Sequence, residues 1–156
     1  MGAHDLIIRT DDLTDPRSQA LVRRHLAGMH ENSPPESVHA LDISGLRQPG
    51  VTFWTGSMGG EPVVMGALRE LDRDNGELKS MRVADAWLGR GLGRRMLEHL
   101  LREARHRGLR QVWLETGSTP AFAPAIALYE SAGFIACGPF GSYTDDPFSR
   151  FMTRSL

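Results

Sequence analysis

The chain has 156 residues, of which 40% are hydrophobic and 24% are charged, and its formal net charge is -1. This composition is typical of a globular protein, so we expect one domain over residues 1–156. The near-neutral charge gives no support for a nucleic-acid or membrane partner, and no apolar run approaches the roughly 20 residues of a membrane span. The single cysteine, Cys137, excludes an internal disulfide. Because the first residues also lack a signal-peptide pattern, we expect a cytoplasmic protein.

The first third of the sequence predicts one strand followed by a helix. Residues 5–10 (DLIIRT) are rich in β-branched side chains, which is typical of a strand. A helix is expected to begin near Thr14 or Asp15, because Pro16 suits a first helical turn. Within this helix, the residues that recur at helical spacing are Ala20, Leu21, His25 and Leu26. Two prolines at 34 and 35 end this helix, and residues 37–47 are expected to contain another short helical piece.

The rest of the chain predicts three consecutive strands and then an alternation of strands and helices. The three strands are residues 51–57, 61–71 and 76–84, with a hairpin spacing (MGG) and an Asn-Gly turn between them. A helix is predicted next, because one apolar stripe at helical spacing comprises Leu92, Met96, Leu97, Leu100, Leu101 and Ala104. Then follow a strand at 110–116, a helix at 123–133 that ends at Gly133, and closing strands at 134–138 and 148–154. This order predicts a mixed sheet with one parallel crossover, in which the last strand could form an edge for a homodimer.

A glycine-rich turn precedes the predicted helix that begins at residue 92. Gly89, Gly91 and Gly93 would bare backbone N–H groups at a helix N-terminus, where phosphate groups bind, and Arg90, Arg94 and Arg95 add positive charge. A Walker A loop would need Gly-Lys-Ser/Thr at its end, and a dinucleotide fingerprint would need a glycine where Met96 stands. We therefore expect a phosphate or pyrophosphate site of another kind.

Four segments occur in a characteristic order around this turn: residues 76–83 (GELKSMRV), 88–93 (LGRGLG), 112–118 (VWLETGS) and 125–134 (AIALYESAGF). Together they resemble the GNAT superfamily of acetyl-CoA-dependent N-acetyltransferases, and in particular its small bacterial members of mostly unassigned substrate. The resemblance implies an α/β (α+β) fold, with a mixed, largely antiparallel central sheet of about six to seven strands flanked by helices. It also implies a splayed cofactor cleft between the fourth and fifth strands. The chain departs from the family pattern at Leu88, where Arg or Gln is usual, and at Phe122, where many members carry Asn.

The resemblance also implies roles for individual residues. Acetyl transfer to an amine needs a base for the ammonium proton and an acid for the departing thiolate. Glu77 matches the position where the family often has its catalytic glutamate, and Tyr129 matches the tyrosine of the family segment at residues 125–134. We therefore expect Glu77 to be the general base and Tyr129 the general acid. Main-chain groups of Met81 and Val83 are expected to pair with pantetheine amides. The implied cofactor-binding set is Met81, Arg82, Val83, Leu88, Gly89, Arg90, Gly91, Leu92, Gly93, Arg94 and Arg95.

The amine acceptor is less well defined by the sequence. Its candidate contacts are Phe53, Trp54, Lys79, Glu115 and Thr116, although strand aromatics are more often core residues. The pocket is expected between the N-terminal helices, residues 31–42 and the loop at 138–147. The histidines show no metal-ligand spacing, so no metal is predicted. The leading interpretation is transfer from acetyl-CoA to a small-molecule amine. A non-catalytic acyl-CoA sensor and an enzyme acting on a protein amine or aminoacyl-tRNA are the alternatives.

Overall fold

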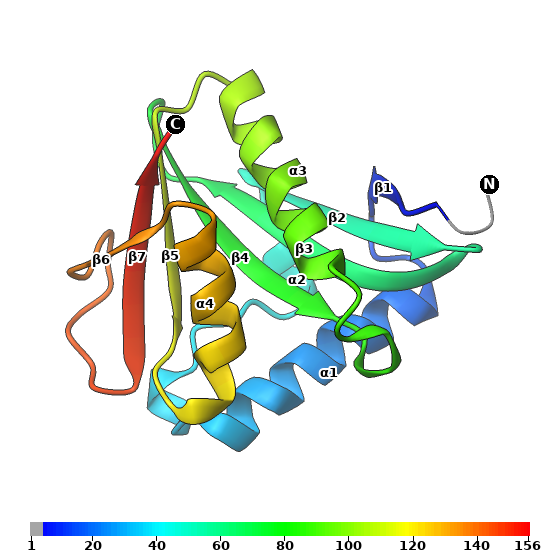
Figure 1. The fold of residues 1–156 in the computed structure, drawn as a ribbon, viewed down its shortest axis with the longest axis horizontal. Helices are drawn as coiled ribbons and strands as arrows, with labels where there is room; N and C mark the ends of the chain where they lie inside the picture. Colours follow the sequence, from blue (N-terminus) through cyan, green and yellow to red (C-terminus); the bar gives the residue numbers. More distant parts are fainter. Residues whose placement is uncertain (1–4) are drawn as a thin grey trace.

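The computed structural model describes residues 5–156, whose strands form one seven-stranded sheet in the order β1-β2-β3-β4-β5-β7-β6 (Figure 1). The strands are β1 Ile7–Thr10, β2 Val51–Met58, β3 Glu61–Glu70, β4 Asn75–Val83, β5 Gln111–Gly117, β6 Ile135–Cys137 and β7 Ser149–Ser155. The helices are α1 Pro16–Asn32, α2 Ile43–Leu46, α3 Leu92–His106 and α4 Ala123–Ser131.

Helix α1 begins where the sequence predicts, because the Asp15 side chain accepts a hydrogen bond from the Arg17 backbone N–H at 2.9 Å. That bond satisfies one of the free donors of the first turn. The predicted helical piece at residues 37–47 is shorter than expected. It contains only α2, which is capped by Asp42, and residues 38–42 before it are not helical.

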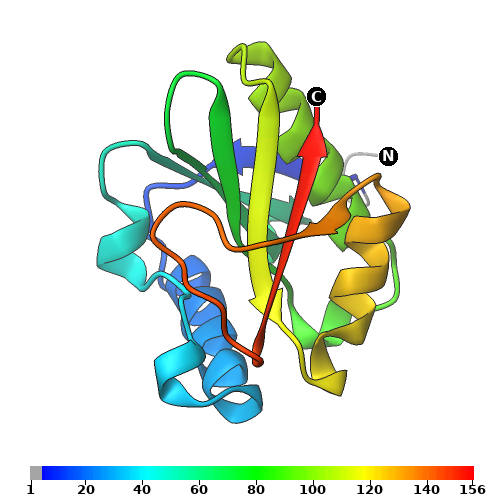
Figure 2. The same ribbon diagram turned by 90° about the vertical axis from the view of Figure 1, so that its left-hand side faces the viewer.

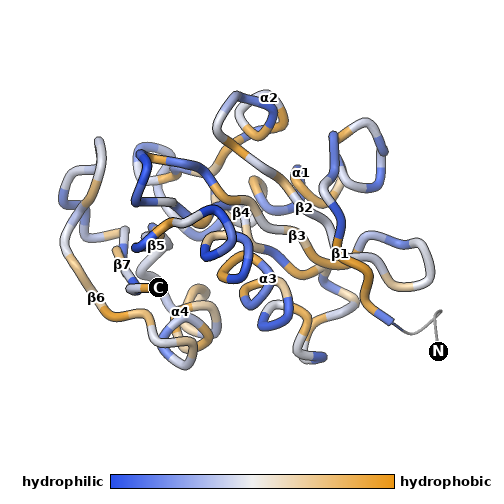
Figure 3. Tube along the Cα trace, turned by 90° about the horizontal axis from the view of Figure 1, so that it is seen from above, coloured by the Kyte–Doolittle hydropathy of each residue, from blue (hydrophilic) through white to orange (hydrophobic). Residues whose placement is uncertain are grey.

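The sheet separates two hydrophobic clusters, with α1 and α2 on one face and α3 and α4 on the other (Figure 3). All six residues of the predicted α3 stripe are buried, and they pack in the cluster that also contains Val64 and Leu68 of β3. Leu21 and Val22 of α1 pack on the other face against Met65 and Ala67. Strand β3 is therefore covered on both sides, which explains its continuous apolar run.

The pairing of the strands confirms a mixed, largely antiparallel sheet. Strands β2 and β3 are joined by Gly59 and Gly60, both at positive φ as a two-residue hairpin turn requires. Strands β4 and β5 are parallel, and α3 forms the crossover between them.

The last strand, β7, is not the edge strand that the sequence suggested. It pairs with β5 on one side and with β6 on the other, so β6 is the edge. Chain order could not reveal this, because β7 inserts between two strands that precede it. The loop between β6 and β7 returns beside the segment that links α1 and α2, where Ser37 Oγ donates to Asp146 Oδ2 at 2.6 Å (Figure 2). This loop thereby comes close to the carboxyl end of β5.

Candidate functional site

A bulge in β4 opens the sheet between its fourth and fifth strands. The antiparallel register shifts between Met65 and Ala67 of β3, and Ser80 opposite them has φ +58°, a left-handed conformation that costs a non-glycine residue about 1 kcal/mol or more. The parallel ladder between β4 and β5 ends at the pair Leu78 and Leu114. Beyond this pair the two strands diverge. The buried hydroxyl of Ser80 finds no hydrogen-bond partner within residues 5–156.

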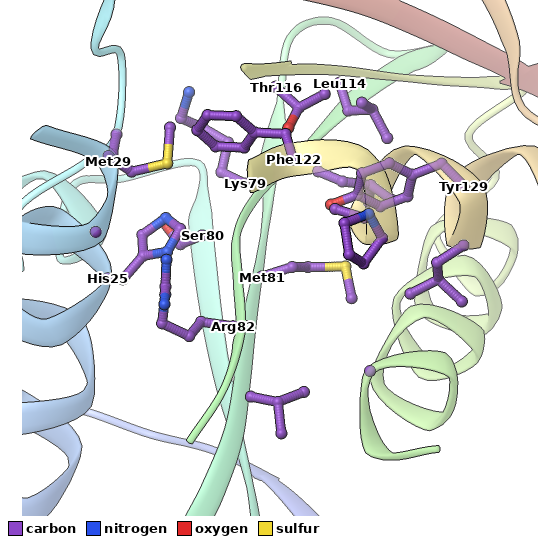
Figure 4. A pocket seen from close by; sticks show the side chains of 18 of the residues that line it. His25, Met29, Lys79, Ser80, Met81, Arg82, Leu114, Thr116, Phe122 and Tyr129 are labelled. Atoms are coloured by element: carbon purple, nitrogen blue, oxygen red, sulfur yellow. The ribbon is translucent and has the colours of Figure 1, made fainter. Parts of the chain in front are cut away.

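A cavity of about 440 Å³ occupies this opening. Residues 78–83 of β4, residues 114–116 of β5, and parts of α1 and α4 line it. In Figure 4, Met81 and Tyr129 point toward each other across the cavity, whereas His25 and Arg82 meet on the α1 side. Of the predicted cofactor-binding residues, those that line this cavity are Met81, Arg82, Val83, Leu88 and Gly93.

The glycine turn lies at the end of this cavity, directly before α3. Gly91 is the N-cap of α3 with φ +76°, and no side chain caps the amides that follow it. A Cβ built on Gly89 or Gly91 would meet nothing within 4 Å, so the backbone here is open to a ligand. Open amides at the positive end of a 15-residue helix suit a pyrophosphate. The turn and the cavity together therefore fit coenzyme A.

The side chains around the turn contribute unequally. Arg90 stacks over the Trp87 ring at 4.6 Å, Arg94 donates to Ser131 Oγ at 2.8 Å, and Arg95 is exposed on the first turn of α3. The Leu92 side chain is buried in the core, so only its backbone N–H can face a ligand. Leu88, the departure from the family pattern, is 63% exposed at the cavity rim.

Tyr129 lies on the last turns of α4, on the wall of the cavity opposite β4. The helix ends with Gly133 at φ +93° and with the Phe134 N–H bonded to the Tyr129 carbonyl at 3.0 Å, which fixes this turn. Burial, with a contribution from Glu115, raises the pKa of Tyr129 to about 12. The phenol is consequently protonated at neutral pH and can donate a proton to an atom in the cavity.

A second cavity, of about 580 Å³, lies on the α1 side of the sheet near the other end of β4. Three lining side chains form a row across neighbouring strands, from the exposed Arg69 inward: Arg69 pairs in register with Glu77, and Glu77 pairs with Trp113. Residues 140–143 of the β6–β7 loop and His39 and Leu41 close it. These are segments in which the sequence predicts the acceptor pocket. Lys79 and His39 line both cavities, so the two adjoin there.

Glu77 and Lys79 form a buried ion pair between the two cavities. The Lys79 Nζ lies 3.2 Å from Glu77 Oε2, and the side chains are only 6% and 2% exposed for Lys79 and Glu77. The Tyr143 hydroxyl donates to the same oxygen at 2.5 Å and accepts from Lys79 at 3.0 Å. Burial and the Glu77 carboxylate both raise the pKa of Tyr143, so its proton stays on the phenol. Both donors reach Oε2, and no donor from the described residues is bonded to Oε1.

A second carboxylate lies across the opening from Lys79. Glu115 lines the first cavity with Thr116 and accepts a hydrogen bond from Ser149 Oγ at 2.8 Å. Burial raises its pKa, and the hydrogen bond from Ser149 opposes this shift.

His25 is held in a neutral state on the α1 side of the first cavity. Its Nδ1 accepts from Arg82 Nε at 2.9 Å, which assigns the ring proton to Nε2. Burial, together with the charges of Arg82 and Lys79, lowers the pKa of His25 to about 3. Arg82 packs so closely over Gly28 that a Cβ there would lie 2.6 Å from its Nη2.

Two of the predicted acceptor contacts lie elsewhere. Phe53 and Trp54 are each 3% exposed and belong to the hydrophobic clusters on opposite faces of the sheet, and neither lines either of these two cavities. Successive residues of a strand point to opposite faces, so the two side chains could not both face one pocket. The sequence analysis did not single out Arg69, Ser80, Trp113 or Tyr143. Only the loop that carries Tyr143 was placed near the pocket.

Within residues 5–156, no three His, Cys, Asp or Glu side chains gather closely enough to hold a metal ion. In the same part of the chain, no helix has the length and apolarity needed to cross a membrane.

A sheet splayed at a β4 bulge and open amides before α3 are the features expected of an acyl-CoA-dependent N-acyltransferase. The model of the Acetyltransferase (GNAT) family matches residues 16–134, and the chain belongs to this family. Its members transfer acyl groups and use acetyl-CoA, so the predicted family and enzyme class are confirmed.

Two relatives and a solved structure support this family assignment. The uncharacterized N-acetyltransferase YsnE of Bacillus subtilis is 48% identical, over 96% of this chain and 99% of that protein. The uncharacterized N-acetyltransferase YedL of Escherichia coli is also 48% identical, over 96% of this chain and 94% of its own. The crystal structure of a putative acyl-CoA N-acyltransferase from Klebsiella pneumoniae has a TM-score of 0.79 at 29% identity and covers 97% of both chains.

Proposed function

We propose that the protein transfers the acetyl group of acetyl-CoA directly to the primary amine of a small molecule. The observation that carries this proposal is the junction of the two cavities at Lys79 and His39. The first cavity, with the glycine turn at its end, suits the cofactor. The second, with a carboxylate on its floor, suits an amine. Acetyl-CoA would supply the acyl group activated as a thioester.

Glu77 is the proposed proton acceptor. Alkyl ammonium groups have a pKa near 10, so an amine must lose a proton before it can attack at neutral pH. Lys79 and Tyr143 donate to Oε2 and orient the carboxylate, while Oε1 carries no donor from the described residues. An amine entering the second cavity can therefore reach Oε1, directly or through a water molecule.

Tyr129 is the proposed proton donor to the departing thiolate. Tyr129 lines the first cavity and not the second. A proton donor to the thiolate has to lie on the cofactor side. Its raised pKa keeps the proton available across the physiological range. Main-chain groups of Met81 and Val83, on the strand that borders the opening, are proposed to bind the pantetheine arm.

The test is release of free CoA from acetyl-CoA, followed with a thiol reagent across a panel of amines, amino acids, polyamines and N-terminal peptides. We expect turnover with at least one small amine, well above the rate with water alone. Turnover confined to peptides would overturn the small-molecule acceptor and favour a protein amine. The matched variants Tyr129→Phe and Glu77→Gln should each slow the reaction with the same acceptor.

A further inference from the structure

The second cavity carries features that select among amines. Its volume of about 580 Å³ lies within the range of about 300–1,000 Å³ typical of small-molecule sites. Four side chains around it are formally charged: Arg69, Asp72, Glu77 and Lys79. Their partners decide which of these charges remains for a ligand.

Two of the four charges neutralise each other, and a third is held by hydrogen bonds. Glu77 and Lys79 neutralise each other in the buried pair. The Asp72 carboxylate closes the β3–β4 turn, where its Oδ1 accepts from the backbone N–H groups of Asp74 and Asn75 at 2.8 and 2.9 Å. Arg69 forms no ion pair within residues 5–156 and is exposed at the rim of the cavity. A guanidinium is always charged, and its planar fork matches a carboxylate.

Arg69 points into the cavity and not away from it. Directly opposed residues of an antiparallel pair share one face of the sheet, and Arg69 opposes Glu77 in register. The charge of Arg69 also acts on the Tyr143 hydroxyl, whose pKa it lowers against the stronger effect of burial. The unpaired cation thus lies on the same side of the cavity as the proposed base.

Aromatic side chains form part of the remaining wall. The rings of Trp113 and Phe140 lie 5.4 Å apart at 36°, and those of Phe140 and Tyr143 lie 5.0 Å apart at 67°. The Trp113 Nε1–H donates a hydrogen bond to Asn75 Oδ1 at 2.9 Å, which fixes the indole in place. The parts of these half-buried rings that line the cavity offer apolar surface to a ring of a ligand.

We infer that the acceptor is a primary alkyl amine that bears both a carboxylate and an aromatic ring, such as an aromatic amino acid. Arg69 binds the carboxylate, the rings of Trp113, Phe140 and Tyr143 hold the aromatic group, and Glu77 receives the amine. This inference rests on the proposed function, since it names the acceptor class of the same site. A polyamine would have to bring further positive charge toward Arg69, which disfavours that class.

The experiment compares acceptors that differ in one group. L-Phenylalanine is compared with phenethylamine, which lacks only the carboxylate, and with L-alanine, which lacks only the ring. We expect kcat/KM for phenylalanine to exceed that for each of the other two by about tenfold or more. One charge-assisted hydrogen bond provides such a ratio for the carboxylate, and burial of the phenyl group provides it for the ring. Equal values for phenylalanine and phenethylamine would overturn the inference.

The variant Arg69→Gln assigns the preference to this residue. It should reduce the phenylalanine-to-phenethylamine ratio to about one, and Arg69→Lys should leave an intermediate ratio because it keeps the charge and loses the fork. The matched control is Arg73→Gln, which replaces an exposed arginine of the β3–β4 turn that does not line the cavity and should keep the wild-type ratio. A ratio unchanged in Arg69→Gln would refute the assignment.

Calorimetric titration of phenylalanine into the protein with CoA present gives a readout independent of turnover. Weaker binding to Arg69→Gln than to the control supports the site. If no amine of any kind releases CoA, the proposed function fails. If amines react without regard to carboxylate or ring, only the acceptor class fails.

Discussion

Replacing Glu77 by Gln should reduce both stability and activity, and the two losses can be separated. Gln keeps the shape and the acceptor oxygen but removes the charge opposite Lys79, whose side chain is 6% exposed. Leaving one member of a buried ion pair without its partner costs about 3 kcal/mol or more. For a domain of this length, each 1 kcal/mol lowers Tm by about 2–4 °C, so a fall of roughly 6–12 °C is expected in differential scanning calorimetry.

The double variant Glu77→Gln with Lys79→Met removes both charges. A buried ion pair replaced by uncharged groups of similar volume is often close to neutral for stability, so Tm should return most of the way to the wild-type value. Activity should not return, because no base has been restored. The single variant Lys79→Met shows how much of the kinetic loss comes from the lysine alone.

The kinetic loss should also depend on pH. At pH 7 an alkyl amine is almost entirely protonated, and loss of a general base lowers the rate by about 100-fold to 10,000-fold. Near pH 10 the free amine is abundant, so the gap between Glu77→Gln and wild type should shrink. A double variant with wild-type turnover at pH 7 would refute Glu77 as the base and leave it a purely structural role.

Three further changes test the cofactor turn, the proton donor and the buried histidine. Gly91→Asp should weaken CoA binding in calorimetry by about tenfold or more. Gly91→Asn tolerates positive φ without the charge and should weaken binding less. Equal CoA affinities of the two variants would place the pyrophosphate elsewhere. Tyr129→Phe should lower kcat, and because the pKa of Tyr129 is raised to about 12, the wild-type pH–rate profile should show no limb from this phenol up to pH 10. The folded-state pKa of His25 near 3 lies below the ordinary 6.5, so its stabilising contribution is complete above pH 6.5 and falls by about 1.4 kcal/mol per pH unit as the pH drops toward 3. His25→Gln, which can still accept from Arg82, should flatten the loss of Tm between pH 6 and 4; an unchanged slope would assign it to other groups.

Local patterns in the sequence predicted the elements well. The six-residue apolar stripe of α3 and the caps at Asp15 and Gly133 depend on neighbours within a few positions, and the structure confirms all of them. The parallel crossover followed from the order of strands and helices. The insertion of β7 between β5 and β6 did not, because it depends on pairing between segments that are not consecutive.

The candidate site shows the same division. Glu77 and Tyr129 were chosen from their places in motifs, and both line cavities in the structure. Tyr143 was not chosen, because its contact with Glu77 joins residues 66 positions apart. Ser80 gave no signal either, since nothing in its residue type indicates a left-handed conformation in mid-strand. Phe53 and Trp54 were chosen for their aromatic character, but the pleat sends one to each face.

The bulge at Ser80 also divides β4 into two halves whose pleats are out of phase. Before it, the odd-numbered residues Glu77 and Lys79 face the α1 side; after it, the even-numbered Arg82 faces that side, and Val83 lies 3.5 Å from a Cβ placed on Gly93 of α3. One extra residue thus reverses which face each later side chain of the strand occupies. Without it, Met81 would lie on the α1 side and Arg82 would face the core beneath α3, so the two side chains would exchange faces of the sheet.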